Sequence, residues 1–391
     1  MIESSAQQGV AGPMVARILR RIRNGELKRG EQLGTEVKLA EANDISVMTV
    51  RRALDSLVEE GVIERRRGRG LFVAEPFRAS RIIQVVVPSL THDECVNMIR
   101  GLQECAQQSD YDVQVSDAHS DYSRVMDLIS RLPRGTARGA VIRYIHDSKF
   151  AAAIYELHRQ HFPFVVVDHR LADLDVSSVT SDNYGAGYLA GEELLKRGHR
   201  RIALVMFSGV RTSEQRLEGL RDALNDAGYP FKRSWRQEFQ VPDPLGDWSG
   251  AIDEATAQVM RQQDRRPTAI LYGNDRSAIF GCRTLQRLGF RIPDDVSVIG
   301  NGNTEVGTLV RPTLATLKQP SVEQGREAYR LLRGLLNEPS TVPRHVKLPV
   351  GWIPRESVGP APDSGKRTAR IQKQGVCVQP GQPQEESERA S

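Results

Sequence analysis

The chain has 391 residues, of which 39% are hydrophobic and 26% are charged. At roughly 100–200 residues per domain, this length predicts two or three globular domains. No run of about 18 apolar residues occurs, which excludes a membrane-spanning helix, and the N-terminus lacks the apolar stretch of a secretory signal, so we expect a cytoplasmic protein. The net charge of +5 is small, so local charge clusters matter more than the total.

Catalytic and metal-binding motifs are missing from the sequence. The four cysteines (Cys95, Cys105, Cys282 and Cys377) form no CxxC pair and have no zinc-type spacing to histidine. The chain also lacks Walker A, HExxH and GxSxG motifs, and no nucleophile–base pair can be nominated. We therefore expect no catalytic residues, no metal and no cofactor.

Residues 1–76 are Arg-rich and mostly helical in pattern. Apolar residues from Met14 to Ile22 recur at helical spacing, and Thr35 and Ser46 are candidate N-caps for a second and a third helix. Two short apolar runs then flank a basic turn with four arginines in residues 65–70. This order predicts a winged helix-turn-helix domain that binds double-stranded operator DNA. A small helical domain with a solvated charged turn is the alternative.

Residues 13–74 resemble the N-terminal domain of the GntR family of bacterial regulators. The matching positions are Gly25, Gly30, Leu33, Glu36, Leu39, Ala40, Ser46, Thr49–Arg51, Ala53, Leu54, Leu57, Gly61–Ile63, Gly68 and Gly70–Val73. The resemblance implies a third helix in the major groove and a hairpin, the wing, on the phosphates or in the minor groove. The predicted DNA contacts are Lys38, Ser46, Met48, Thr49, Arg51, Arg52, Arg66, Arg67 and Arg69.

Two positions depart from the family pattern. The family usually has arginines where this chain has Val37 and Val47, and such arginines commonly read guanines. The usual operator sequence is therefore not expected here. Met48 or Val47 could touch a thymine methyl group, and packing inside the domain is an equally good reading of Val47.

Beyond about residue 80, short apolar runs alternate with helical stretches. Strands are predicted at 82–88, 112–115, 139–142, 164–168, 201–206, 269–272 and 296–299, with helices between them. This alternation predicts an α/β fold of two doubly wound halves in series, with a ligand cleft beyond the carboxyl ends of the strands.

The same region resembles the sensor domain of the lactose- and galactose-repressor family, and hence periplasmic sugar-binding proteins. The stretches that carry the resemblance are 166–170, 181–204, 216–220, 247–249, 269–300 and 312–320. It implies two lobes joined by three crossing strands, with a small-molecule effector between them. The combination of domains is similar to chimeric regulators of the arabinose-repressor type.

The resemblance carries over a set of effector-binding residues. A guanidinium and an amide can pair with vicinal hydroxyls, while an aromatic plane covers the C–H face of a sugar. Ordinary surface contacts are the alternative for each position. The candidates are Ser89, Asp168, Arg216, Trp248, Asn274, Asn301 and Gln319.

Gly302 departs from the sensor family. It stands where the family has an aspartate that accepts hydrogen bonds from sugar hydroxyls, and Asn301 or Asn303 could substitute for it. A sugar acid or sugar phosphate would tolerate the loss of that carboxylate.

These features predict a transcriptional regulator, and a repressor rather than an activator. We expect it to act as a homodimer and to be controlled by a sugar, sugar acid or sugar phosphate. The predicted domains are a DNA-binding domain (1–76), a linker (77–80), a two-lobed sensor (81–358) and a disordered tail (359–391). The alternatives are a DNA-binding regulator with a degenerate sensor and a sugar-binding transport component.

Overall fold

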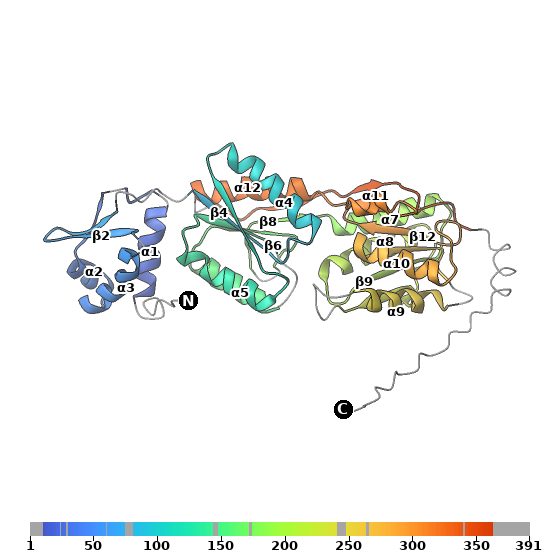
Figure 1. Cartoon of the computed structure of the whole chain (residues 1–391), viewed down its shortest axis with the longest axis horizontal. Coiled ribbons are helices and arrows are strands. Elements are labelled where there is room, and N and C mark those ends of the chain that lie inside the picture. Colours follow the sequence, from blue (N-terminus) through green and yellow to red (C-terminus); the bar gives the residue numbers. More distant parts are fainter. Residues whose placement is uncertain are drawn as a thin grey trace, which may run out of the picture.

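The computed structural model describes residues 11–23, 25–28, 30–59, 61–74, 81–143, 148–171, 174–240, 248–262, 266–338 and 341–362. Three bodies follow one another along the long axis of the molecule (Figure 1). We call them the head (residues 11–74), the N-lobe (the described parts of 81–181 and 321–348) and the C-lobe (the described parts of 182–318 and 351–362). The fold is mixed α/β, as predicted, and none of the described helices has the length and apolarity needed to cross a membrane.

The head contains three helices and a small antiparallel sheet. Thr35 Oγ1 accepts a hydrogen bond from the Lys38 amide, and Ser46 Oγ accepts one from the Thr49 amide, so both predicted caps form. The sheet order is β1-β3-β2, and β1 was not predicted because it has only three residues. The elements are α1 (Gly12–Arg23), β1 (Gln32–Gly34), α2 (Glu36–Asn43), α3 (Val47–Glu59), β2 (Ile63–Arg66) and β3 (Gly70–Val73).

The basic turn of the head is shorter than predicted. Arg65 and Arg66 are not in the turn but on β2, where they pair with Leu71 and Gly70 of β3. The tip is formed by residues 67–69, with Gly68 at a φ of +72° that favours glycine. The predicted linker at 77–80 lies outside the described residues.

The N-lobe is a parallel sheet of order β14-β8-β7-β6-β4-β5 with helices on both faces. Its central strands β4 and β7 are almost wholly apolar because both of their faces are covered. The elements are β4 (Ile82–Val87), α4 (Asp93–Gln107), β5 (Asp112–Asp117), α5 (Tyr122–Arg131), a 3-10 turn (Leu132–Arg134), β6 (Gly139–Arg143), α6 (Ser148–Arg159), β7 (Phe164–Val167), β8 (Ser178–Ser181), α12 (Ser321–Asn337) and β14 (His345–Leu348).

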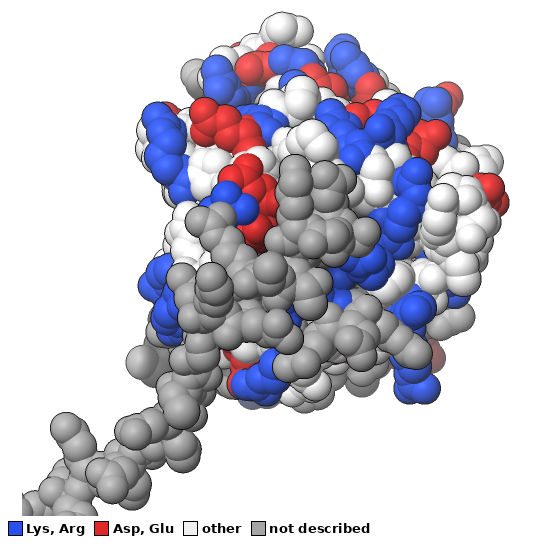
Figure 2. All heavy atoms as spheres, turned by 90° about the vertical axis from the view of Figure 1, so that its right-hand side faces the viewer, with Lys and Arg blue, Asp and Glu red and all other residues white. Residues whose placement is uncertain are grey.

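The C-lobe has a similar sheet, of order β10-β9-β11-β12-β13-β15, in which only the β13–β15 pair is antiparallel among the described pairings. On the end of the molecule that Figure 2 shows, basic and acidic side chains are interspersed. The elements are α7 (Asn183–Lys196), β9 (Ile202–Phe207), α8 (Arg211–Asp226), a 3-10 turn (Arg233–Trp235), β10 (Arg236–Phe239), α9 (Ser249–Met260), β11 (Ala269–Tyr272), α10 (Asp275–Arg287), β12 (Ser297–Asn301), α11 (Val306–Leu309), β13 (Ala315–Lys318) and β15 (Gly351–Ile353).

The two lobes are joined by three crossings of the chain, as the resemblance implied, and are not separate halves in series as the strand pattern alone suggested. The chain crosses between them three times, from β8 to α7, from β13 to α12 and from β14 to β15. Helix α12 packs beside α4 on the N-lobe sheet, where Tyr329 and Leu332 complete the core around Val85 and Val141 (Figure 1). The local pattern of strands and helices cannot show these crossings. Helix α12 and strand β14 return to the N-lobe, where they pack against elements far away in sequence.

The predicted disordered tail begins too early. Residues 359–362 are described and are held against the C-lobe: His199 bonds through Nε2 to the Gly359 carbonyl, the Gly359 amide donates to Ser297 Oγ, and the Ala361 amide donates to the Arg197 carbonyl. These backbone bonds hold a segment that has little apolar surface of its own. The rest of the predicted tail, 363–391, lies outside the described residues.

Candidate functional site

A cleft of about 490 Å³ lies between the lobes, at the carboxyl ends of their strands. Of the seven candidate effector residues, six line it: Asp168, Arg216, Trp248, Asn274, Asn301 and Gln319. Ser89 does not. Its side chain is buried and accepts a hydrogen bond from the Thr91 amide at 3.1 Å, so it stabilises the turn after β4.

Arg216 is the buried cation of the C-lobe side. Its Nη1 donates to Asn183 Oδ1 at 2.6 Å, and its Nη2 lies 3.4 Å from both Ser213 Oγ and the Gly273 carbonyl oxygen. Its hydrogen-bond partners in the described chain are therefore uncharged. Burial lowers the pKa of Arg216 to about 10, so the side chain is still charged at neutral pH.

The position of Arg216 is fixed by a close approach of α7 to α8. A Cβ atom on Gly187 of α7 would lie only 1.9 Å from the Arg216 carbonyl oxygen, and one on Gly219 would lie 2.0 Å from the Tyr184 carbonyl oxygen. These two glycines let the helices touch backbone to backbone. The contact sets how far the guanidinium reaches into the cleft.

Three aromatic rings form an apolar wall of the cleft. The rings of Phe207 and Trp248 meet edge to face, with centroids 5.2 Å apart, and Phe207 lies 4.7 Å from Phe239. The Arg276 guanidinium covers Trp248 at 4.2 Å. Phe207 and Phe239 end β9 and β10, a position that could have identified them from the sequence.

The Asn274 side chain both caps a helix and lines the cleft. Its Oδ1 caps α10 by accepting from the Ser277 amide at 2.8 Å. Its Nδ2 has no hydrogen-bond partner among the described residues, so the amide can still donate into the cleft. Only half of this side chain is available to a ligand.

Asp168 belongs to an ion pair on the N-lobe side. Arg143 Nε donates to Asp168 Oδ2 at 2.7 Å, and Gln324 Nε2 donates to Oδ1 at 3.1 Å. Burial opposes ionisation of Asp168, but the Arg143 charge and these hydrogen bonds outweigh it and hold the pKa of the carboxyl below its usual value. Sequence reasoning missed Arg143, although it ends β6.

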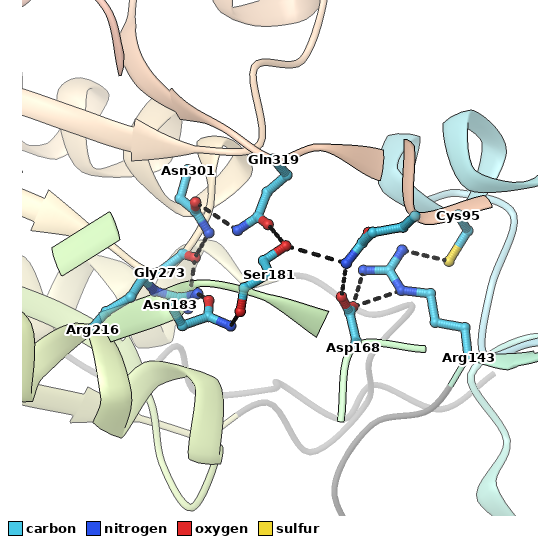
Figure 3. Close-up of polar contacts among 10 residues, drawn as sticks. Cys95, Arg143, Asp168, Ser181, Asn183, Arg216, Gly273, Asn301 and Gln319 are labelled. Atoms are coloured by element: carbon cyan, nitrogen blue, oxygen red, sulfur yellow. Dashed lines mark hydrogen bonds and ion pairs between the residues drawn. The ribbon is translucent and has the colours of Figure 1, made fainter. Parts of the chain in front are cut away.

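A chain of hydrogen bonds continues from Asp168 to the C-lobe (Figure 3). Gln324 Nε2 also donates to Ser181 Oγ at 3.2 Å, Ser181 Oγ donates to Gln319 Oε1 at 2.5 Å, and Gln319 Nε2 donates to Asn301 Oδ1 at 2.9 Å. Asn301 Nδ2 then donates to the Gly273 carbonyl at 3.2 Å. Asn301 and Gln319, predicted as effector ligands, are thus used by the junction between the lobes.

Glu94 approaches the position of the missing carboxylate from the opposite lobe. A Cβ atom on Gly302 would lie 3.2 Å from Glu94 Oε1, and Gly302 has a φ of +141°. Both candidate substitutes already make hydrogen bonds within the protein: Asn301 bonds Gln319 and the Gly273 carbonyl, and Asn303 Oδ1 accepts from Arg355 Nη2 at 2.6 Å. Glu94 has no hydrogen-bond or ion-pair partner among the described residues and lines the cleft. Sequence reasoning missed it.

The charges of the cleft balance. Its described lining has two carboxylates, Glu94 and Asp168, and two guanidiniums, Arg143 and Arg216. Because Arg143 and Asp168 pair with each other, Glu94 and Arg216 remain to face a ligand. The arrangement can accept from a hydroxyl, donate to a hydroxyl or carbonyl, and cover an apolar face.

The second candidate site is the exposed side of α2, α3 and the wing. All nine predicted DNA contacts have side chains at least partly exposed to solvent. Lys38 lies on α2, Ser46 precedes α3, and Ser46 Oγ lies 2.7 Å from Thr49 Oγ1, so these two hydroxyls mainly cap the helix. Met48, Arg51 and Arg52 follow on α3, Arg66 ends β2, and Arg67 and Arg69 are in the turn.

Glu36 connects these elements. It accepts from Arg51 Nη2 at 2.7 Å and from Arg65 Nε at 3.0 Å, and Arg65 also pairs with Asp55. The hydrogen bond from Arg51 lowers the pKa of Glu36 in spite of partial burial, so the carboxylate stays charged. Glu36 and Arg65 thereby position Arg51 at the surface of α3.

On the wing, arginines stack on an aromatic ring. The Arg66 guanidinium lies 4.6 Å from the centroid of Phe72 and also bonds Glu64, and that of Arg69 lies 5.8 Å from the same centroid. Arg67 is exposed and has no acidic partner among the described residues. The wing therefore presents cations that are ordered by one ring.

Comparison with known proteins matches both parts of the chain. Residues 13–73 match the family described as bacterial regulatory proteins, gntR family, and residues 192–358 match the periplasmic binding protein-like domain. The chain is 24% identical to an arabinose metabolism transcriptional repressor of Geobacillus stearothermophilus (83% of this chain, 90% of the relative). It is 26% identical to a ribose operon repressor of Haemophilus influenzae (72% and 82%). A ribose-bound LacI family regulator from Enterococcus faecium superposes with a TM-score of 0.60 at 27% identity (71% and 99%).

Proposed function

We infer that this chain, which joins a GntR-type DNA-binding head to a periplasmic-binding-protein-like sensor, is a transcriptional repressor whose affinity for its operator is set by a small effector in the cleft. The observation that carries this proposal is the cleft itself, because polar side chains from both lobes line it. A chain of hydrogen bonds from Asp168 to Asn301 joins the lobes beside it. The head (residues 1–76) reads DNA, and the lobes (residues 81–358) sense the effector.

The effector we propose is a small, uncharged polyol such as a sugar. Glu94 and Arg216 together add no net charge, and hydroxyl groups can pair with both. The aromatic wall of Phe207, Phe239 and Trp248 suits the C–H face of a sugar ring. The ribose bound to the Enterococcus relative supports this class. Sugar acids and sugar phosphates fit less well, because Glu94 faces the cleft as an unpaired carboxylate.

The effector acts by changing the angle between the lobes. A ligand held by Glu94 on one lobe and Arg216 on the other binds one arrangement of the lobes better than another, and this difference is the free energy available for regulation. In a homodimer, a change in the lobes alters the spacing of the two heads. Half-sites of an inverted repeat require a fixed spacing, so DNA affinity changes with it.

The test is fluorescence anisotropy with labelled DNA from upstream of the gene, titrated at two salt concentrations. We expect tight binding that weakens steeply with salt, because phosphate contacts release counterions. A variant with Arg51, Arg66 and Arg69 changed to Ala should lose binding. The matched control changes Arg124, Arg283 and Arg333 to Ala; these exposed arginines lie outside the head and carry the same total charge. Equal affinity of both triple variants would refute the assignment of the head.

The effector part is tested in the same assay. Ribose, arabinose and cellobiose are added alongside their acids and phosphates, and one neutral sugar should shift the DNA affinity. A sugar acid or phosphate that binds at least tenfold tighter than its neutral parent in calorimetry would overturn the proposed effector class.

A further inference from the structure

The head exposes three large apolar side chains at the first turns of its two DNA-facing helices. Val37 on α2 is 51% exposed, and Val47 and Met48 on α3 are 38% and 59% exposed. The apolar face of α3, with Val50, Leu54 and others, is buried in the core of the head. Val47 is not part of that core, so its exposure favours contact with DNA over packing.

Cations surround these apolar residues. Lys38 follows Val37, and Arg51 and Arg52 lie one helical turn after Val47 and Met48. Arg51 also bonds Glu36, which adjoins Val37, so the first turn of α2 lies beside the second turn of α3. Lys38 and Arg52 have no acidic partner among the described residues. An apolar patch beside two cations without acidic partners, Lys38 and Arg52, suits a polyanion that also presents apolar groups.

Duplex DNA is a polyanion that presents apolar groups at its thymine bases. The major groove contains a single apolar group, the 5-methyl group of thymine, and the N-terminal residues of a recognition helix contact base edges there. None of the three side chains can donate or accept the hydrogen bonds that identify guanine or adenine.

We propose that Val47 and Met48, with Val37 beside them, read thymine methyl groups, so that each operator half-site has thymines at the base pairs that face the first turn of α3. This inference rests on the proposed function, because it assumes that the head binds operator DNA. In this proposal the apolar side chains recognise thymine. Arg51, Arg52 and the wing bind phosphates or other bases.

The experiment begins with selection of binding sites from a random duplex DNA library by the full-length protein. The selected half-site is then synthesised with each thymine replaced in turn by deoxyuridine, which removes the methyl group and keeps the base pairing. We expect about a fourfold loss of affinity at one or two positions, the effect of burying about one methyl group. In a Val47→Ala, Met48→Ala variant, thymine and deoxyuridine should bind equally well at those positions.

Two further variants sharpen the test. Val47→Arg should change the selected base from thymine to guanine at the facing position, because arginine can bond guanine O6 and N7 together. Val342→Ala changes an exposed valine outside the head and should leave the thymine preference unchanged. All changed side chains are solvent-exposed, so the fold of the head is preserved.

The outcomes separate the inference from the function on which it rests. An enriched site whose affinity is unaffected by every deoxyuridine replacement overturns thymine reading and leaves operator binding intact. The same result follows if the Val47→Ala, Met48→Ala variant keeps the full thymine preference. Absence of any enriched sequence overturns sequence-specific operator binding and the inference with it.

Discussion

Ser181 and Gln319 lie on two different crossovers between the lobes and are joined by a hydrogen bond, from Ser181 Oγ to Gln319 Oε1 at 2.5 Å. Ser181 ends β8, just before the first crossover, and Gln319 lies in the second crossover, between β13 and α12. Gln324 connects this pair to the N-lobe ion pair, and Asn301 connects it to the C-lobe (Figure 3). A change in the angle between the lobes must therefore rearrange these bonds.

The two crossover residues should be energetically coupled. Ser181→Ala and Gln319→Ala are each expected to lower the free energy of unfolding by about 1 kcal/mol. The double variant should lose less than the sum, with a coupling energy of about 0.5–1 kcal/mol, because the two residues share partners. Urea unfolding of the four proteins measures the cycle. Strict additivity would show that the bond does not join the crossovers.

Loss of the Asp168 charge should destabilise the N-lobe strongly. Asp168→Asn keeps the side-chain shape and tolerates the local φ of +75°, but it leaves Arg143 buried without a counter-charge. We expect a loss of about 3–5 kcal/mol in the free energy of unfolding at neutral pH. The control, Asp127→Asn, breaks an exposed pair with Arg131 and should cost no more than about 0.5 kcal/mol.

The cost of Asp168→Asn should also depend on pH. The pKa of Asp168 is lower in the folded than in the unfolded protein, so its stabilising contribution is complete above the usual carboxyl pKa of about 4. The contribution is lost as the pH falls through the lower, folded value. The difference in stability between the wild type and Asp168→Asn should therefore shrink in acid, and a difference that grows below pH 4 would contradict the assignment.

The helix contact beneath Arg216 should not tolerate a methyl group. Gly187→Ala places a Cβ within 1.9 Å of the Arg216 carbonyl oxygen, so α8 must move. We expect a loss of about 1–3 kcal/mol or more. Gly334→Ala is the matched control, since a Cβ at this helical position meets nothing within 4 Å and should stabilise α12 by about 0.5–1 kcal/mol. Equal effects of the two changes in urea unfolding would disprove the close contact.

A carboxylate restored at position 302 should be repelled by Glu94. Gly302→Asp and Gly302→Asn introduce similar strain at a φ of +141°, and only the aspartate adds a charge beside Glu94 Oε1 and the more distant Asp275 Oδ2. We expect Gly302→Asp to be the less stable variant at pH 7. This difference should shrink in a Glu94→Gln background, and thermal unfolding of the four proteins measures it. If the difference between Asp and Asn survives unchanged in the Glu94→Gln background, Asp275 rather than Glu94 causes it, because Asp275 Oδ2 would lie 3.6 Å from the new Cβ.

The elements of the head could be predicted because their signals are local. Thr35 and Ser46 cap helices within four residues of themselves, and Gly68 marks its own turn. The lobes were predicted as strands and helices for the same reason. Helix α12 and strand β14 were not assigned to the N-lobe, because their partners α4 and β8 are more than 150 residues away in sequence.

The candidate site was predicted only in part. Arg216, Trp248 and Asn274 were found through the resemblance, and they line the cleft. Glu94 was missed because its relation to Gly302 exists only where the lobes face each other. Arg143 could have been found, since it ends a parallel strand as Phe207 does.

The threefold crossing of the chain has a consequence for dissection of the molecule. A fragment that stops at Ser181 contains five of the six strands of the N-lobe but lacks α12, so the sheet around Val85 and Val141 would face water. The head differs, because its three-stranded sheet and its core are complete within residues 11–74. The DNA-binding part can therefore be excised or transplanted as one continuous piece of the gene, whereas neither lobe can be cut out with a single pair of ends.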